Sequence, residues 1–133
     1  MVPPAVLVVD SDLGFIVALS YELHIRRIEA LPALTTGEAQ GMVRDLQYLD
    51  VLVINCAISG ACTFAEEIAN ARPDVRILGI ISQGNDCKNC ENLLTARFRD
   101  PEDKGPEQIV YCADVIEVLI TRARYERDRH DLT

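Results

Sequence analysis

The chain of 133 residues is 49% hydrophobic and 26% charged, and it carries a formal net charge of −8 with only 5% aromatic residues. This length fits one domain with a single core, which must be mainly aliphatic because aromatic side chains are scarce. The negative charge argues against direct binding to nucleic acid or to an anionic membrane, and no apolar stretch approaches the length of a membrane span.

Four short apolar runs predict β-strands at residues 6–9, 28–34, 51–54 and 77–81. Three of these runs lack the alternation of a half-buried strand and are rich in β-branched residues, as expected for strands buried on both faces of a parallel sheet. The run 28–34 contains Pro32, which cannot donate a backbone hydrogen bond. It is therefore predicted to be an edge strand.

Amphipathic segments between these runs predict helices. Two helices are predicted to begin at capping boxes, Thr35 with Glu38 and Thr63 with Glu66. Pro106 is placed to open the last helix. The apolar positions at helical spacing are Ile16, Leu19 and Leu23 in the first helix, Ala39, Met42, Val43 and Leu46 in the second, and Ile109, Ala113, Ile116 and Ile120 in the last.

Between the fourth apolar run and the last helix, only residues 91–96 predict a helical turn or two, and a short segment follows at 97–99. Strands and helices thus alternate without a linker or a repeat, which predicts a doubly wound α/β sheet. In such sheets the ligand site lies at the carboxyl ends of the strands. The segments to examine there are 10–12, 55–60, 82–90 and 100–101.

A basic run near the end of the chain comprises Arg122, Arg124, Arg127 and Arg129. Neutral and acidic residues alternate with these arginines. The run is therefore predicted to be a solvated face of the last helix.

Four motifs, in this order, resemble the receiver domains of response regulators. Residues 6–12 resemble the family's first strand with its acidic loop, residues 50–60 the third strand with its loop, and residues 73–81 the fourth strand. Residues 99–102 lie where the family has a Lys-Pro dipeptide. The resemblance covers nearly the whole chain and implies bacterial two-component signalling.

The resemblance also implies the architecture of the chain. The expected fold is a flavodoxin-like, doubly wound, five-stranded parallel sheet in the order 2-1-3-4-5, with helices on both faces. A receiver-like domain is expected over residues 1–125, followed by a helix end or tail over residues 126–133.

The family's chemistry needs an acidic pair that binds Mg²⁺ and an aspartate that accepts a phosphoryl group. In this chain Asp10 matches the first acid, but Ser11 stands where the second acid belongs. Asn55 stands at the acceptor position, where a neutral amide cannot form an acyl phosphate. Asp10 and Asp12 alone are too few charged ligands for Mg²⁺, so no cofactor is expected. Asp12 or Ser11 can instead cap the first helix.

The remaining family positions have changed as well. The hydroxyl position is Ile81, or Ser82 if the register shifts by one residue. Asp100 replaces the lysine and would repel a bound phosphate, although it could accept a hydrogen bond from Asn55 or Ser82. Pro101 follows a cis peptide bond in the family. A degenerate phosphoacceptor pocket is therefore predicted.

Four cysteines fall at this same edge of the sheet, Cys56 and Cys62 around the loop after the third strand and Cys87 and Cys90 after the fourth. Three interpretations stay open for them. They are small buried hydrophobic residues, a reversible Cys87–Cys90 disulfide, or a thiolate metal site. Cys112 lies in the last helix and is predicted to serve packing.

Three functions follow from these patterns. The leading one is a non-enzymatic, phosphorylation-independent receiver that binds another signalling or regulatory protein, or forms a homodimer through residues 91–129. The second is a thiol or metal sensor on the same fold, and the third is an authentic phospho-receiver or a small phosphatase-like enzyme. Residues 1–12 lack a signal-peptide pattern, and the odd number of cysteines does not suggest a secreted disulfide framework, so a cytoplasmic location is expected.

Overall fold

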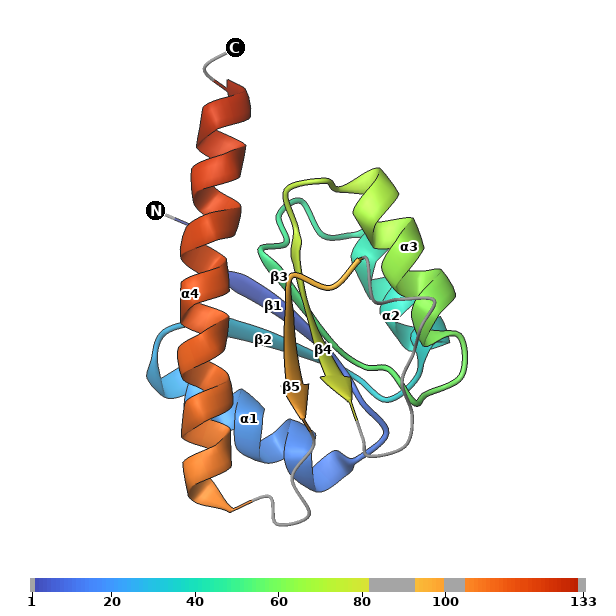
Figure 1. Ribbon diagram of the computed structural model, residues 1–133, viewed down its shortest axis with the longest axis vertical. Helices are drawn as coiled ribbons and strands as arrows, with labels where there is room; N and C mark the ends of the chain where they lie inside the picture. The colour runs from blue at the N-terminus through green and yellow to red at the C-terminus, as the bar shows by residue number, and fades with distance from the viewer. Residues whose placement is uncertain (1, 82–92, 100–104, 132–133) are drawn as a thin grey trace.

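A computed structural model describes residues 2–81, 93–99 and 105–131 of the chain (Figure 1). Strands and helices alternate along it. The strands are β1 (Ala5–Val9), β2 (Glu29–Ala33), β3 (Val51–Asn55), β4 (Arg76–Ile81) and β5 (Ala96–Arg99). The helices are α1 (Leu13–Ile25), α2 (Thr36–Arg44), α3 (Ala61–Ala71) and α4 (Pro106–Asp131).

The five strands form one parallel sheet in the order β2-β1-β3-β4-β5, which confirms the predicted fold. β2 lies at an edge and contains Pro32, as the sequence predicts. Helices α1 and α4 cover one face of the sheet, and α2 and α3 cover the other. The switch in strand order lies between β1 and β3, where a doubly wound fold places its ligand site.

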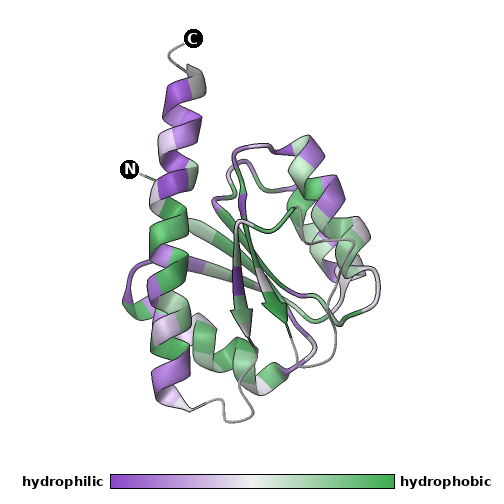
Figure 2. Cartoon of the chain, viewed as in Figure 1, coloured by the Kyte–Doolittle hydropathy of each residue, from purple (hydrophilic) through white to green (hydrophobic). Residues whose placement is uncertain are grey.

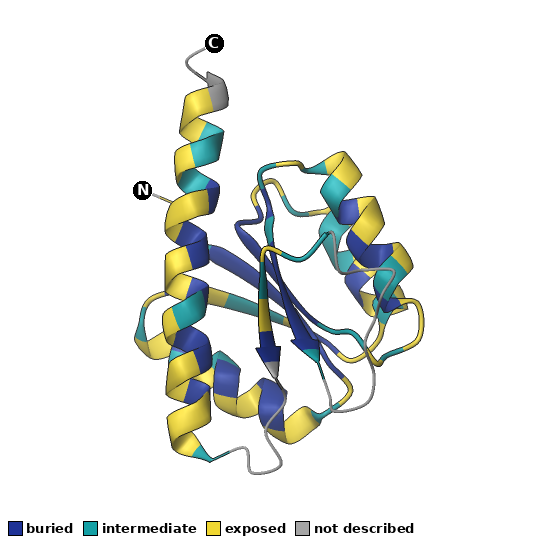
Figure 3. Cartoon of the chain, viewed as in Figure 1, coloured by how far each residue is buried: buried dark blue, intermediate teal, exposed yellow. Residues whose placement is uncertain are grey.

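The core consists of two layers, one on each face of the central strands (Figure 3). All five residues of β1 are buried, and alternate side chains serve the two layers because successive residues of a strand point to opposite faces. Val6 and Val8 pack with α1 and α4, while Leu7 and Val9 pack toward α2 and α3. This double burial explains the continuous apolar runs in the sequence.

The helix start predicted at Thr35 is confirmed, because the Thr35 hydroxyl accepts the backbone N–H of Glu38 at 3.1 Å. The Glu38 carboxylate accepts the N–H of Leu34 at 3.0 Å, one residue before the N–H that a capping box would use. The capping box predicted at Thr63 is wrong. Helix α3 begins at Ala61, and its N-cap is Gly60, three residues before Thr63, with a φ of 78° and no side-chain hydrogen bond. A glycine adopts this left-handed conformation without steric cost, so the chain turns into the helix before it reaches Thr63.

The helical turn predicted over residues 91–96 is wrong in its described part, residues 93–96. Thr95 already pairs with β4: its backbone N–H donates to the carbonyl oxygen of Ile77 at 2.8 Å, and its hydroxyl accepts the Ile77 N–H at 3.1 Å. Ala96 then begins β5. Pairing with the edge of the sheet therefore prevails over the local helical preference.

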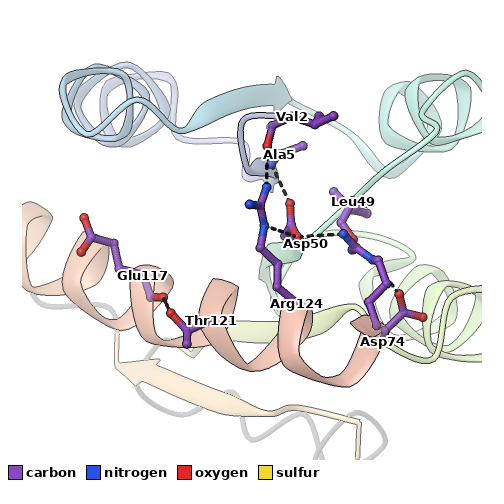
Figure 4. Close-up of polar contacts among 9 residues, drawn as sticks. Val2, Ala5, Leu49, Asp50, Asp74, Glu117, Thr121 and Arg124 are labelled. Carbon is purple, nitrogen blue, oxygen red and sulfur yellow. Dashed lines mark hydrogen bonds and ion pairs between the residues drawn. The ribbon is translucent and has the colours of Figure 1, made fainter. Parts of the chain in front are cut away.

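Helix α4 begins at Pro106 as predicted and runs through residue 125 to Asp131, beyond the edge of the sheet (Figure 1). The predicted solvated face is wrong for two of its arginines. Arg124 and Arg127 both contact Asp50, a carboxylate that is only 1% exposed at the amino edge of the sheet (Figure 4). None of the described helices combines the length and the apolar character that a membrane span requires.

Candidate functional site

Asp10 lies directly after β1, at the carboxyl edge of the sheet, and is 1% exposed. Its Oδ1 accepts the backbone N–H of Asp12 at 3.0 Å and the side-chain amide of Asn55 at 3.3 Å. Its Oδ2 is buried and has no hydrogen-bond partner among the described residues. A buried carboxylate oxygen without a donor is costly, so this pocket is not optimised for stability alone.

Asn55 ends β3 beside Asp10, because the parallel register pairs Val9 with Ile54 and brings the next residue of each strand to the same edge. The amide nitrogen donates to Asp10, and the amide oxygen accepts the backbone N–H of Ala57 at 2.9 Å. Both ends of the Asn55 side chain are therefore engaged within the loop that surrounds the pocket.

The structure brings together Asp10, Asp12 and Asn55 among the predicted pocket residues. Asp12 is half-buried and caps α1, since its Oδ1 accepts the N–H of Phe15 at 3.1 Å. Ser11 is exposed beside them, and Ile81 is half-buried at the end of β4. Ser82, Asp100 and Pro101 lie outside the described residues, so their predicted hydrogen bonds and the predicted cis bond stay predictions.

The donors at this pocket do not fit a hard divalent cation, which takes several oxygen ligands and prefers negative charge. Asn55 turns its N–H group, not its oxygen, toward Asp10. Ser11 supplies no carboxylate, and an oxygen of Asp12 is used by the helix cap. No group of three or more histidine, cysteine or acidic side chains that could hold a metal is found among the described residues.

The described cysteines differ in burial and in whether the sulfur is a free thiol or part of a disulfide. Cys56 follows β3 as a free, half-buried thiol, and Cys112 is free and buried in α4, where it packs as predicted. Cys62, at the start of α3, is half-buried and disulfide-bonded, and its partner lies outside the described residues. Cys87 and Cys90 also lie outside the described residues. The predicted disulfide joined Cys87 to Cys90, so the bond at Cys62 is a different one, which the sequence did not predict.

The two free thiols are expected to alkylate slowly in the folded protein. Burial raises the pKa of the Cys56 thiol, although the nearby charge of Arg97 opposes part of that rise, and burial raises the pKa of Cys112 to about 12. A raised pKa lowers the thiolate fraction at neutral pH, and the thiolate is the nucleophile. Mass spectrometry after iodoacetamide should therefore show Cys112 unmodified, and Cys56 modified faster as the pH rises.

Denaturant with a reductant is the control, because all five cysteines should then react. Rapid modification of Cys112 in the native protein at neutral pH would contradict the buried position of this thiol.

Two features were not predicted from the sequence, namely a role for Asp50 and the apolar character of the outward positions of α1. The apolar character of α1 could have been predicted, because the helix contains only one acidic residue, Glu22, and no lysine or arginine. A helix that is apolar all round is expected to be covered on all sides.

Neither a family model nor a curated protein matches the sequence. Solved structures do match it. The adenylate cyclase from Rhodopirellula baltica has a TM-score of 0.83 at 14% identity, over 98% of this chain and 97% of that one. A CheY-like response regulator receiver domain protein from Methanospirillum hungatei has a TM-score of 0.75 at 15% identity, over 93% of this chain and 99% of that one.

NtrX from Brucella abortus, in complex with ADP, has a TM-score of 0.78 at 16% identity over 98% of this chain. This chain spans only 29% of the length of that NtrX chain. Identities this low show the fold alone, and the fold is that of CheY-like receiver domains. A fold does not by itself fix a function, so the chemistry has to be argued from the residues.

Proposed function

We propose that this protein is a degenerate receiver that accepts no phosphoryl group, binds no Mg²⁺ and works through protein–protein contacts in the cytoplasm, with no catalytic activity of its own. The observation that carries the proposal is the hydrogen bond from the Asn55 amide to Asp10. It puts a neutral donor where the family's chemistry needs a nucleophilic carboxylate, and it ties that donor to the acid that would hold the metal.

Phosphoryl transfer to a carboxylate requires a nucleophilic oxygen and a cation that neutralises charge on the transferred group. Asn55 has no ionised oxygen, and the carboxylate of Asp10 is 1% exposed, so it is poorly placed to attack a donor from solvent. With Ser11 in place of a second acid, the pocket supports neither requirement.

Incubation with acetyl phosphate and Mg²⁺ is expected to leave the mass of the protein unchanged, and Mg²⁺ alone is expected to leave its melting temperature unchanged. The comparison is the double variant S11D/N55D, which adds two carboxylates to Asp10 and Asp12 at the pocket. In this variant Mg²⁺ should raise the melting temperature, because the cation relieves the repulsion among these carboxylates.

A phosphoryl adduct on the wild-type protein that is lost in hydroxylamine would contradict the proposal, since that reactivity identifies an acyl phosphate. A clear rise in the melting temperature of the wild-type protein with Mg²⁺ would contradict the metal-free pocket. The mass measurement tests the absence of phosphorylation, and the melting temperature tests the absence of a Mg²⁺ site, so either claim can be contradicted without the other.

The surface that we propose for the partner lies within residues 91–129, of which 93–99 and 105–129 are described. Tyr111, Val118 and Tyr125 of α4 are 52–64% exposed, and they follow one another at seven-residue spacing on one side of the helix. The ring of Tyr111 lies 5.7 Å from that of Phe98 in β5, which places this row beside the edge strand. Another regulatory protein is the candidate occupant of this surface.

A thiol sensor on the same fold is the second candidate function, and the disulfide at Cys62 favours it. Cys62 is the second residue of α3, which follows the loop after Asn55, so a change of redox state there would act close to the pocket in sequence. The test compares partner binding with and without a thiol reductant, in the wild type and in C62S. Binding that is indifferent to both would exclude the sensor.

A further inference from the structure

The outward face of α1 is exposed and apolar. Leu13, Val17, Tyr21 and Ile25 follow one another at four-residue spacing and are 57–67% exposed. Figure 2 shows α1 mostly in the colours of apolar residues, and Figure 3 shows exposed segments along the same helix. The buried face of α1, by contrast, is already filled by the core packing of Phe15, Ile16, Leu19 and Leu23.

No charged side chain interrupts this face. The other exposed residues of α1 are Gly14, Ala18 and His24, so no exposed residue of this helix is an aspartate, glutamate, lysine or arginine. Glu22 and Arg26 lie at its border and are ion-paired with each other at 3.1 Å. Contiguous exposed apolar surface of this kind marks an interaction site more often than chance solvent exposure.

We propose that this face, defined by Leu13, Val17, Tyr21 and Ile25, is the self-association surface of the protein and that its occupant is α1 of a second copy. The net charge of −8 makes most encounters between two copies repulsive. On this face of α1, two copies can contact each other without bringing two carboxylates together.

An antiparallel arrangement of the two helices fits the residues. A two-fold axis beside Leu19 pairs Val17 with Tyr21 of the second copy, and Leu13 with Ile25, so each contact joins two apolar side chains. The small side chains at Gly14 and Ala18 let the helices approach closely. The two helix dipoles then run in opposite directions, which is the favourable arrangement.

The charges at the two ends of α1 agree with this orientation. Asp12 caps the amino end of the helix, and Arg27, exposed and with a φ of 62°, follows its carboxyl end. In the antiparallel pair each Arg27 lies at the end that carries Asp12 of the other copy. A parallel pair would bring like charges together at both ends.

The size of the surface predicts a weak, reversible dimer. A helix of 13 residues is about 20 Å long and about 10 Å wide, so this face offers far less than the roughly 800 Å² per partner of a standard interface. Dissociation constants in the micromolar range or weaker follow. The dimer should also strengthen with salt, because salt screens the repulsion between two negatively charged copies.

Sedimentation velocity across a concentration series tests the proposal on the full chain. The wild-type mass should rise from monomer toward dimer, and Val17→Asp should raise the dissociation constant at least about tenfold, because it buries an unpaired charge at the centre of the contact. The matched control is Val118→Asp, at a valine of similar exposure on α4. It should leave the dimer unchanged.

Circular dichroism melts establish that each variant is folded, which an exposed position should allow. A protein that is monomeric at every concentration would overturn the proposal. A dimer weakened by Val118→Asp but not by Val17→Asp would also overturn it, and would place self-association on the α4 surface instead. Neither result bears on the phosphorylation experiment, so the proposal and the proposed function can fail separately.

Discussion

Replacing Asp50 with alanine is expected to lower the free energy of unfolding by about 3–5 kcal/mol, the usual effect of removing one partner from a buried ion pair. Asp50 is buried immediately before β3 and serves three donors at once. Its Oδ2 accepts the backbone N–H of Ala5 at 2.9 Å, and its Oδ1 is contacted by Arg124 at 3.4 Å and by Arg127 at 3.2 Å.

The loss should be large because Asp50 joins parts of the chain that are far apart in sequence (Figure 4). Arg124 also donates to the carbonyl oxygen of Val2 at 2.8 Å, and Arg127 donates to that of Leu49 at 2.9 Å. Without the carboxylate, two guanidinium groups and one backbone N–H lose their shared acceptor. The second half of α4 would then be held to the start of β1 and β3 only by the bonds to backbone carbonyls and by apolar packing.

Urea denaturation followed by circular dichroism measures this loss. Asp74→Ala is the matched control, since Asp74 contacts only Arg127 in the described part of the chain, at 3.1 Å, and is more exposed. It should cost less than about 1 kcal/mol, as surface ion pairs do. Equal losses in the two variants would show that Asp50 does not hold the helix in place.

Replacing Gly79 with valine is expected to destabilise the protein by about 2–3 kcal/mol through overpacking. Gly79 lies in the middle of β4, and Leu94 occupies the space that a side chain would take. A Cβ atom at this position would lie 2.6 Å from one methyl carbon of Leu94 and 2.9 Å from the other, with the Cys56 sulfur at 3.2 Å. The glycine thus allows the segment before β5 to close directly on the sheet.

The control is Gly41→Ala in α2, where nothing lies within 4 Å of an added Cβ atom. This substitution should raise stability by about 0.5–1 kcal/mol, because alanine restricts the unfolded chain and favours the helix. The double variant G79V/L94A should recover part of the loss at Gly79. If Leu94→Ala gives no recovery, the clash is not the cause.

The pocket residues could be predicted in part. The sequence places Asp10, Asp12 and Asn55 at strand ends, and parallel strands bring those ends to one edge, so their proximity follows from the order of the elements. The direction of the Asn55 amide could not be predicted. It depends on which neighbouring atoms accept and donate, and these are set by Asp10 and by the backbone of Ala57.

The amino-acid sequence alone determined the doubly wound architecture, the edge position of β2 and the placement of Asp10, Ser11 and Asn55 at the carboxyl ends of β1 and β3. Periodicity and residue chemistry are local, so they can be read without coordinates. Only the tertiary structure decided that Arg124 and Arg127 reach a buried carboxylate and that the apolar outward face of α1 is left uncovered. Both depend on contacts between residues distant along the chain, and no local pattern encodes which partner a side chain will meet.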